Sequence, residues 1–389
     1  MIYNKIRWDD LNAVVSLGTF DGGSDKEYHA TIELNKAYAS AKEQFLTLEK
    51  AVHRLSSKLE KATLVWRHYY VSDAINQREY MSENTDEALT IVQQPPLNGA
   101  KAMMWVYFVE NTQLFKTPAG TTVMKRRSYT HLFDTRLHER SSVESNSPLM
   151  PLPLSVENQT NRIFNRYKDN LALHGCTIKS NCIRTWIFVQ NVDVQYAGMV
   201  TARREFFERE GLTSKTHFIA STGIEGRYIY PDVLTLIDAY AIAGITPEQI
   251  KFLKAPTHLN PTHEYGVTFE RGTAVDYGDR RHIFISGTAS IDNRGEIVHP
   301  LDVEKQTART FENVKTLLSE ADADMTNVAC MIVYLRDTAD YAIVNRYLNQ
   351  YYPEIPTVTI LAPVCRPGWL VEVECIAIKT IEKQQFDAF

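Results

Sequence analysis

Hydrophobic and polar positions follow one order that recurs three times along the chain. Residues 306–378 show it most clearly, because Phe311, Val314, Leu318 and Ala321 fall on one face of a helix. The β-rich run NVACMIVYLRD follows, and a second helical pattern, ADYAIVNRYLNQYY, leads to strands in TVTILAPV and WLVEVECIAI. The pattern predicts a helix, a strand, a second helix and two closing strands.

The same order is present in the two preceding parts of the chain. Residues 159–242 repeat it in QTNRIFNRYKDNLALHG, NCIRTWIFVQN, VQYAGMVTARREFFERE and the closing strands of HFIASTGIEGRYIYPDVLTLIDAYAI. The N-terminal third repeats it more faintly, with strands in ATLVWRHYYVSD and ALTIVQQPPLNGAKAMMWVYFV. There an amphipathic stripe predicts the first helix, and it comprises Leu34, Tyr38, Ala41, Phe45, Leu48 and Val52.

One or two β segments precede each first helix, so each copy predicts a ββαβαββ unit. Such a sheet carries both helices on one face, and its other face must be covered. We therefore expect an α+β protein in which three tandem units, residues 1–115, 116–250 and 251–389, close into an intrachain pseudo-trimer. Three independent domains are the alternative, which the short links near 110–127 and 243–262 disfavour.

Composition narrows the function classes. The chain has 389 residues, 44% hydrophobic and 23% charged, with a net charge of −5. That balance argues against a nucleic-acid partner, and the short basic run Lys125-Arg126-Arg127 is interpreted as a solvated strand end. No apolar run is long enough for a membrane span, and MIYNKIRWDDLN lacks an apolar signal-peptide core. We expect a cytoplasmic protein that binds no membrane.

Neither a metal nor a cofactor motif is present. The five cysteines form no CxxC pair, and the eleven histidines, among them His263 and His299, show no metal-ligand spacing. Nucleotide-binding loops and the G-x-S-x-G elbow of serine hydrolases are also missing. The sequence therefore predicts chemistry without metal or cofactor.

Two glutamates in the last strand are the main chemical signal. In WLVEVECIAI, Glu372 and Glu374 fall on one face of the strand, opposite Val371, Val373 and Cys375. A carboxyl pair in an otherwise apolar strand is unusual for a core. Either residue could be a general acid, and either could instead face solvent or pair with an arginine.

The third copy resembles the YjgF/Rid superfamily, whose members are homotrimers of this unit. The resemblance lies in HIFISGTASID, QTARTFENV, VYLRD and LVEVECIAI. A chain with three units resembles the chorismatases more narrowly, through IRTWIFV, RREFF and ASTGI in the middle copy and EYGVTFERG, FISGTASI, VHPLDV and CRPGWLVEVE in the last. Thr357 stands where Rid imine deaminases carry a carboxylate-binding arginine, so simple imine hydrolysis is disfavoured.

The chorismatase resemblance implies an enzyme that protonates the enolpyruvyl ether of chorismate and releases pyruvate, with Glu372 as the proton donor. Such an acid must keep its proton near neutrality, so its pKa must be raised by burial or by a like charge. Chorismate is a dianion, and arginine forks bind carboxylates well. The candidate arginines are Arg184, Arg204, Arg271, Arg336 and Arg366.

Two positions of the resemblance favour 3-hydroxybenzoate as the second product. They are Cys365 and Gly287, the latter in Ser-Gly-Thr-Ala, where the branch that forms a dihydroxycyclohexadiene acid has alanine. Gly287 would give the ring room, and Cys365 would steer the intermediate towards aromatisation. Tyr265 and Thr288 are further substrate-contact candidates.

Several alternatives remain open at this level. A lone cysteine such as Cys365 is usually a small buried hydrophobe. The chain could be a Rid-type deaminase or another small-molecule hydrolase, or a ligand-binding protein without catalysis. We expect the site in a cleft between the second and third units, and a monomer or weak dimer in solution.

Overall fold

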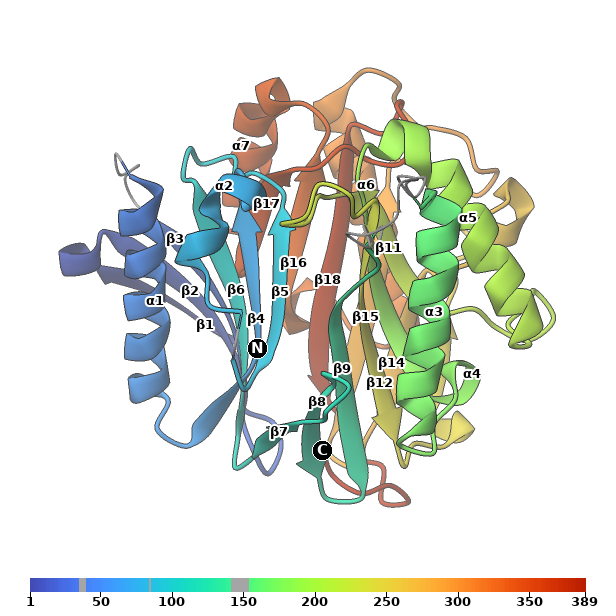
Figure 1. Cartoon of the computed structure of the whole chain (residues 1–389), viewed down its shortest axis with the longest axis horizontal. Helices are drawn as coiled ribbons and strands as arrows, with labels where there is room; N and C mark the ends of the chain where they lie inside the picture. Colours follow the sequence, from blue (N-terminus) through green and yellow to red (C-terminus); the bar gives the residue numbers. More distant parts are fainter. Residues whose placement is uncertain (35–39, 84, 141–153) are drawn as a thin grey trace, which may run out of the picture.

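Three six-stranded sheets form the framework of the protein. The computed structural model describes residues 1–34, 40–83, 85–140 and 154–389 (Figure 1). The strands of the first sheet are β1 (Ile2–Trp8), β2 (Ala13–Phe20), β3 (Glu27–Leu34), β4 (Ala62–Val71), β5 (Ala88–Gln93) and β6 (Ala102–Glu110). Those of the second are β7 (Leu114–Lys116), β8 (Thr122–Arg126), β9 (Tyr129–His138), β10 (Cys182–Val189), β11 (Ala220–Glu225) and β12 (Thr235–Ala243). Those of the third are β13 (Ile250–Leu253), β14 (Gly272–Asp276), β15 (Arg280–Ala289), β16 (Val328–Leu335), β17 (Thr357–Leu361) and β18 (Val371–Thr380).

The strand order is the same in all three sheets. The first runs β1-β2-β3-β6-β4-β5, and the corresponding strands of the other two follow the same path. The helices are α1 (Ala41–Lys58), α2 (Ala74–Gln77), α3 (Val156–Ala172), α4 (Ile178–Asn181), α5 (Val192–Arg209), α6 (Val303–Glu320) and α7 (Tyr341–Tyr351). The expected α+β fold of three tandem units is confirmed.

Each unit carries one strand more than expected, giving the order βββαβαββ. The additional strands β1, β7 and β13 lie at sheet edges, and β7 spans only three residues. The first helix also begins later than predicted. Ser40 caps α1 by accepting a hydrogen bond from the Glu43 amide at 3.2 Å, whereas Leu34 ends β3. Tyr38 lies outside the described residues.

The sheets face inwards and the helices lie outside, with α1 on the left and α3 and α5 on the right of Figure 1. One apolar cluster contains residues of all three units, and within it Trp66 of the first unit packs edge-on against Trp186 of the second, with ring centroids 5.1 Å apart. Three independent domains are therefore excluded. Arg126, predicted to be solvated, is buried, and it forms an ion pair with Asp25 at 2.6 Å.

The strand registers show which positions correspond among the units. The strand that follows the first helix is β4, β10 or β16, and the closing strand is β6, β12 or β18. The second-to-last residue of the former pairs with a residue of the latter at the corresponding position in each unit. These pairs are Tyr334 with Glu372, Phe188 with Leu236, and Tyr70 with Met103. The position of Glu372 is therefore apolar in the other two units. Two residues further along the closing strand, the corresponding residues are Glu374, Asp238 and Trp105.

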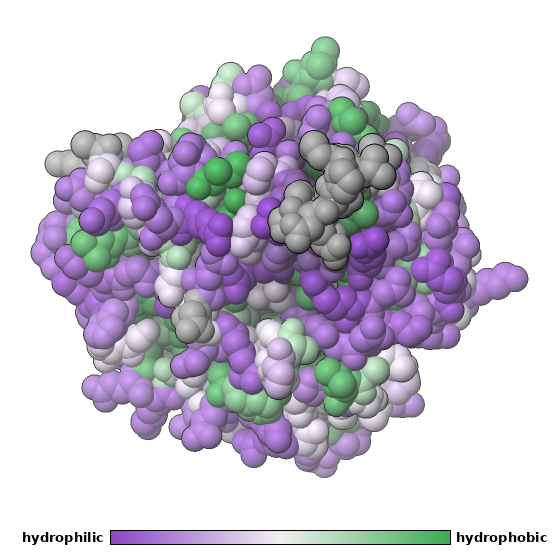
Figure 2. Space-filling view, viewed as in Figure 1, coloured by the Kyte–Doolittle hydropathy of each residue, from purple (hydrophilic) through white to green (hydrophobic). Residues whose placement is uncertain are grey.

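Hydrophilic residues predominate on the face shown in Figure 2, and hydrophobic residues lie there in separate patches. Within the described ranges, no helix combines the length and the apolar character that crossing a membrane requires.

Candidate active site

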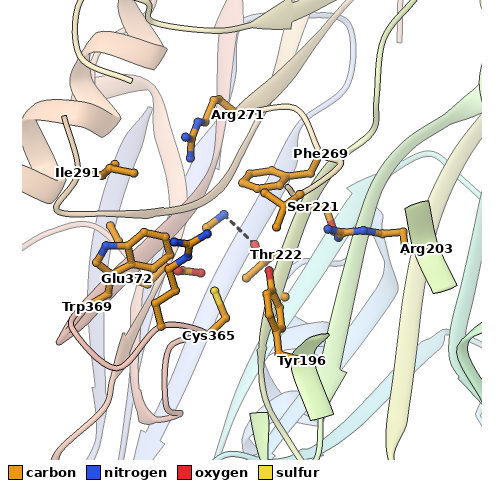
Figure 3. Close-up of a pocket in the computed structure, with 15 residues that line it drawn as sticks. Tyr196, Arg203, Ser221, Thr222, Phe269, Arg271, Ile291, Cys365, Trp369 and Glu372 are labelled. Atoms are coloured by element: carbon orange, nitrogen blue, oxygen red, sulfur yellow. Dashed lines mark hydrogen bonds between the residues drawn. The ribbon is translucent and has the colours of Figure 1, made fainter. Parts of the chain in front are cut away.

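A pocket of about 490 Å³ lies between the second and third units, where the cleft was expected. In Figure 3, Glu372 and Trp369 lie on one side of it and Tyr196 and Arg203 on the other, with Cys365 and Thr222 between them. The lining residues are Tyr196, Arg203, Ser221, Thr222, Gly223, Val267, Phe269, Arg271, Gly287, Ala289, Ile291, Cys365, Arg366, Trp369 and Glu372. The pocket thus combines cations, one carboxyl group and an apolar wall.

Glu372 supplies a carboxyl group to this pocket. Its side chain extends from β18 and is only 4% exposed, so its carboxylate would be poorly solvated. Burial, reinforced by the negative charge of Glu374, raises the pKa of Glu372 to about 8, although Arg184 and Arg271 oppose the shift. At neutral pH the carboxyl group therefore holds a proton that it can transfer.

Glu374 has a different environment although it points to the same face of β18. Its Oε2 accepts a hydrogen bond from Arg184 at 2.7 Å and another from Thr222, and its Oε1 accepts one from Trp186 Nε1 at 2.8 Å. All three donors belong to residues of the second unit, so the Glu374 side chain is held at the junction beside Glu372.

Three arginines bring positive charge to the pocket. Arg203 comes from α5 of the second unit and is buried. Arg271 is also buried and donates to the backbone oxygen of Asn260 at 3.0 Å, while Arg366 lies over the ring of Trp369, 5.3 Å from its centroid. Cations on several sides of a concave pocket favour an anionic ligand with more than one carboxylate.

Cys365 and Gly287 shape the pocket near the acid. Burial and the charge of Glu372 raise the pKa of the Cys365 thiol to about 12, so it is not a thiolate at neutral pH. A Cβ atom on Gly287 would lie 2.0 Å from Oε1 of Glu372. The glycine therefore makes room for the carboxyl group itself, and not only for a substrate ring as the sequence interpretation assumed.

The chain shares sequence with known proteins over its third unit. A family profile described as Endoribonuclease L-PSP matches residues 272–379. A RutC family protein of Pyrococcus abyssi is 38% identical over 129 residues, which are 32% of this chain and 92% of the relative. The 3-aminoacrylate deaminase RutC of Acinetobacter baylyi is 30% identical over 97 residues, which are 24% of this chain and 77% of the relative.

The chain belongs to the YjgF/Rid superfamily. The fold of the whole chain has a counterpart as well, in the crystal structure of a chorismatase. That structure superposes with a TM-score of 0.61 at 17% identity and covers 81% of this chain and 93% of its own. Three fused YjgF/Rid units, as the sequence predicted, are therefore the architecture of this molecule.

The structure brings six of the predicted residues of this YjgF/Rid protein into one region. Glu372, Cys365, Gly287, Arg271 and Arg366 line the pocket, and Thr288 lies beside it, with its Oγ1 donating to the Ser286 oxygen at 2.8 Å. Tyr265 ends a short 3₁₀ turn, Thr262–Tyr265, and its side chain lies outside what the structure describes.

Three predicted arginines are placed elsewhere. Arg184 does not line the pocket, because Glu374 takes up its guanidinium group. Arg336 forms an ion pair with Asp193 at 2.5 Å and donates to the Val364 oxygen at 2.7 Å, which ties the end of β16 to α5. Arg204 is exposed on the outer side of α5. None of the three is among the residues that line this pocket.

Arg203, Tyr196 and Trp369 line the pocket but were not singled out from the sequence. Helical periodicity could have predicted that Arg203 and Tyr196 lie on the inner face of α5. Arg203 follows Met199 by one turn, and both are buried, whereas its neighbour Arg204 must point outwards. In the part of the chain that the structure describes, no cluster of histidine, cysteine, aspartate and glutamate has the form of a metal site.

Proposed function

We propose that this chain is a chorismatase-like enzyme that converts chorismate to pyruvate and a hydroxybenzoate. One observation carries the proposal: Glu372 is a buried carboxyl group, with a pKa raised to about 8, in a pocket that three arginines line. A dianion with an acid-labile enol ether is the kind of substrate that such a site suits. The likeness of the fold to a chorismatase supports the same choice.

The reaction begins with proton transfer from Glu372 to the terminal methylene carbon of the enolpyruvyl group. The double bond supplies the electron pair, and positive charge develops at the ether carbon and oxygen. Arg203, Arg271 and Arg366 hold the two carboxylates, so the methylene lies against the acid. Glu372 becomes an anion as the substrate becomes a cation, and this opposite charge stabilises the developing intermediate.

The favoured second product is 3-hydroxybenzoate. Together with pyruvate it contains the same atoms as chorismate, so no water is consumed, whereas a dihydroxycyclohexadiene acid requires one water. Cys365 supports the first outcome as a neutral thiol close to Glu372 and Tyr196. It acts there by shape and weak hydrogen bonding, because a thiol with this pKa is a poor nucleophile at neutral pH.

A coupled pyruvate assay with chorismate tests the activity, and chromatography of the aromatic product tests its identity. We expect turnover by the wild type and the hydroxylated cyclohexadiene acid as an additional product of Cys365→Ala. If Cys365→Ala forms only 3-hydroxybenzoate, the role of the thiol is wrong. Saturable binding of chorismate without pyruvate release would instead indicate a ligand-binding protein.

The second candidate is a Rid-type deaminase, which the identity to a 3-aminoacrylate deaminase favours. The registers argue against it in a specific way. The residue of the second unit that corresponds to Thr357 and faces the Glu372 pocket is Ser221, so this junction also lacks the arginine of Rid deaminases. Ammonia release from 2-iminoacids or 3-aminoacrylate, without pyruvate release from chorismate, would favour this candidate.

A further inference from the structure

A second, larger pocket lies at the junction between the third and first units. The space between its walls, including the part open to solvent, is about 790 Å³, against about 490 Å³ for the Glu372 pocket. The lining residues are Lys5, Ser16, Glu33, Asn98, Met103, Tyr341, Asn345, Leu348, Asn349, Tyr352, Pro353, Ile355, Thr357 and Thr359. They come from β1, β2, β3, β6 and the β5–β6 connection of the first unit, and from α7, β17 and the segment between them in the third.

This pocket corresponds to the Glu372 pocket by the internal symmetry of the chain. Met103 occupies the position of Glu372 on the closing strand. Thr357 and Thr359 on β17 occupy the positions that Ser221 and Gly223 hold on β11. Both pockets therefore lie between the same two faces of neighbouring units.

The remaining junction, between the first and second units, shows how such a pocket is lost. The residues there that correspond to Thr357, Thr359 and Met103 are Leu89, Ile91 and Leu236. These three side chains are 1%, 0% and 1% exposed, because they pack into the core. Thr357 and Thr359 are instead only partly buried, so their side chains remain accessible from the pocket. Two of the three junctions therefore have polar residues that line a pocket, on β11 between the second and third units and on β17 between the third and first.

The walls of the second pocket suit hydroxyl groups better than carboxylates. Hydroxyl and amide side chains dominate its lining, and its charged groups are one lysine and one glutamate, Lys5 and Glu33. The Glu372 pocket carries three arginines instead. Asparagine and hydroxyl side chains both donate and accept, which matches ligands whose own groups do the same. Tyr341 and Tyr352 add aromatic surface for an apolar ring face.

We propose that the junction between the third and first units is a second ligand site that binds an uncharged, hydroxyl-rich small molecule, such as a monosaccharide or cyclitol. The site binds without turnover, because the thioether of Met103 stands where a proton donor would be needed. The binding itself does not depend on the chemistry assigned to the Glu372 pocket, whereas the expected lack of turnover rests on the proposed function of that pocket.

The test is calorimetric titration of the full-length wild type with glucose, galactose and myo-inositol as separate probes. We expect saturable binding of at least one probe. The variant Thr359→Ile recreates the residue of the closed junction, keeps a β-branched side chain in the strand, and should weaken that binding by about tenfold or more. Asn345→Leu should have a similar effect, because it removes a donor and an acceptor from the other wall.

Glu372→Gln is the matched control, since it alters only the symmetry-related pocket and should leave probe binding unchanged. The proposal is wrong if no probe binds, if binding survives both Thr359→Ile and Asn345→Leu in folded protein, or if Glu372→Gln removes it. Circular dichroism of each variant separates lost binding from lost structure.

Discussion

At the scale of one residue, burial keeps the carboxyl group of Glu372 protonated at neutral pH. Its pKa rises from 4.5 to about 8 because its carboxylate would be buried beside Glu374. Folding therefore takes up a proton between these two pH values, and the stability of the protein falls as the pH rises through this window. The acid is maintained at the expense of stability.

Replacing this acid should separate activity from stability. We expect Glu372→Gln to lower pyruvate release by about 100-fold or more, because the amide has no acidic proton to transfer. The same variant should be more stable at pH 7, on the order of 3 kcal/mol, and equally stable below pH 4.5 where the carboxyl is protonated in both states. Urea unfolding at the two pH values measures the difference, and undiminished activity would remove Glu372 from the mechanism.

The pH dependence of the wild type follows from the same group. Only the protonated form of Glu372 donates, so kcat/KM, which reports the pKa of the free enzyme, should fall as the pH rises through about 8. A rate profile with chorismate measures this midpoint. A profile that stays flat to well above pH 8 would contradict the assignment of the acid.

Gly287 is the second residue with a consequence that can be measured. Gly287→Ala would place a methyl group 2.0 Å from the present position of Glu372 Oε1, so the carboxyl group must move. We expect kcat to fall by about tenfold or more, since a small misplacement of a reacting group is costly. Wild-type kcat in a folded Gly287→Ala variant would show that the carboxyl position is not critical.

Strand alternation, which puts Glu372 and Glu374 on one face, and the resemblance to the chorismatases, which adds Cys365 and Gly287, together predicted this site. They were insufficient for the arginines, because a sequence shows which residues are basic but not which carboxylate each one meets. Arg184 is the clearest case, since its partner Glu374 is distant in the chain and joins it only when β10 and β18 face each other. Helical periodicity could have predicted Arg203, but the sequence analysis named its neighbour Arg204 instead.

At the scale of elements, strand β18 joins the second and third units through a buried ion pair. Arg184 and Glu374 have side chains that are 2% and 6% exposed, so the loss of either leaves a buried charge without compensation. We expect Glu374→Gln to destabilise the protein by about 3–5 kcal/mol. The double variant Arg184→Met/Glu374→Leu should recover most of this loss, as chemical denaturation can measure. Equal stability of single and double variants would contradict the pairing.

The elements themselves were largely predictable because both helical and strand periodicities recur three times. The edge strands β1, β7 and β13 were not predicted as part of the unit, since they are short or only partly buried and carry weak alternation. The start of α1 was misplaced because Leu34 is apolar in either element. Its place in β3 depends on pairing with β2, which is a tertiary property.

At the scale of the whole molecule, Glu27 connects the first unit to the third. It accepts from Arg280 at 2.7 Å, lies 2.8 Å from His282 Nε2, and is fully buried. Burial raises its pKa, but the charges of His282 and Arg280 outweigh burial and hold the pKa well below the usual range. This carboxylate therefore stabilises the fold above pH 4.5, and the contribution is lost as the pH falls towards the lowered pKa.

Glu27→Gln should destabilise the assembled molecule by about 3–5 kcal/mol at pH 7, because Arg280 loses its buried partner. It should also weaken the dependence of stability on acid pH, since the titrating group is gone. Thermal unfolding between pH 7 and pH 3 measures both effects. An unchanged acid profile would show that other carboxylates control the response.

The covalent connection between the units has a consequence for how the molecule behaves in dilute solution. In a homotrimer with sites at subunit boundaries, each site is lost when the subunits dissociate by mass action. Here the two walls of the Glu372 pocket belong to one polypeptide. The covalent link holds the second and third units together at any protein concentration, so dilution does not separate the walls. Turnover per mole of chain should therefore stay constant from micromolar to nanomolar protein, and a tight inhibitor should titrate a single catalytic centre per 44.5 kDa chain.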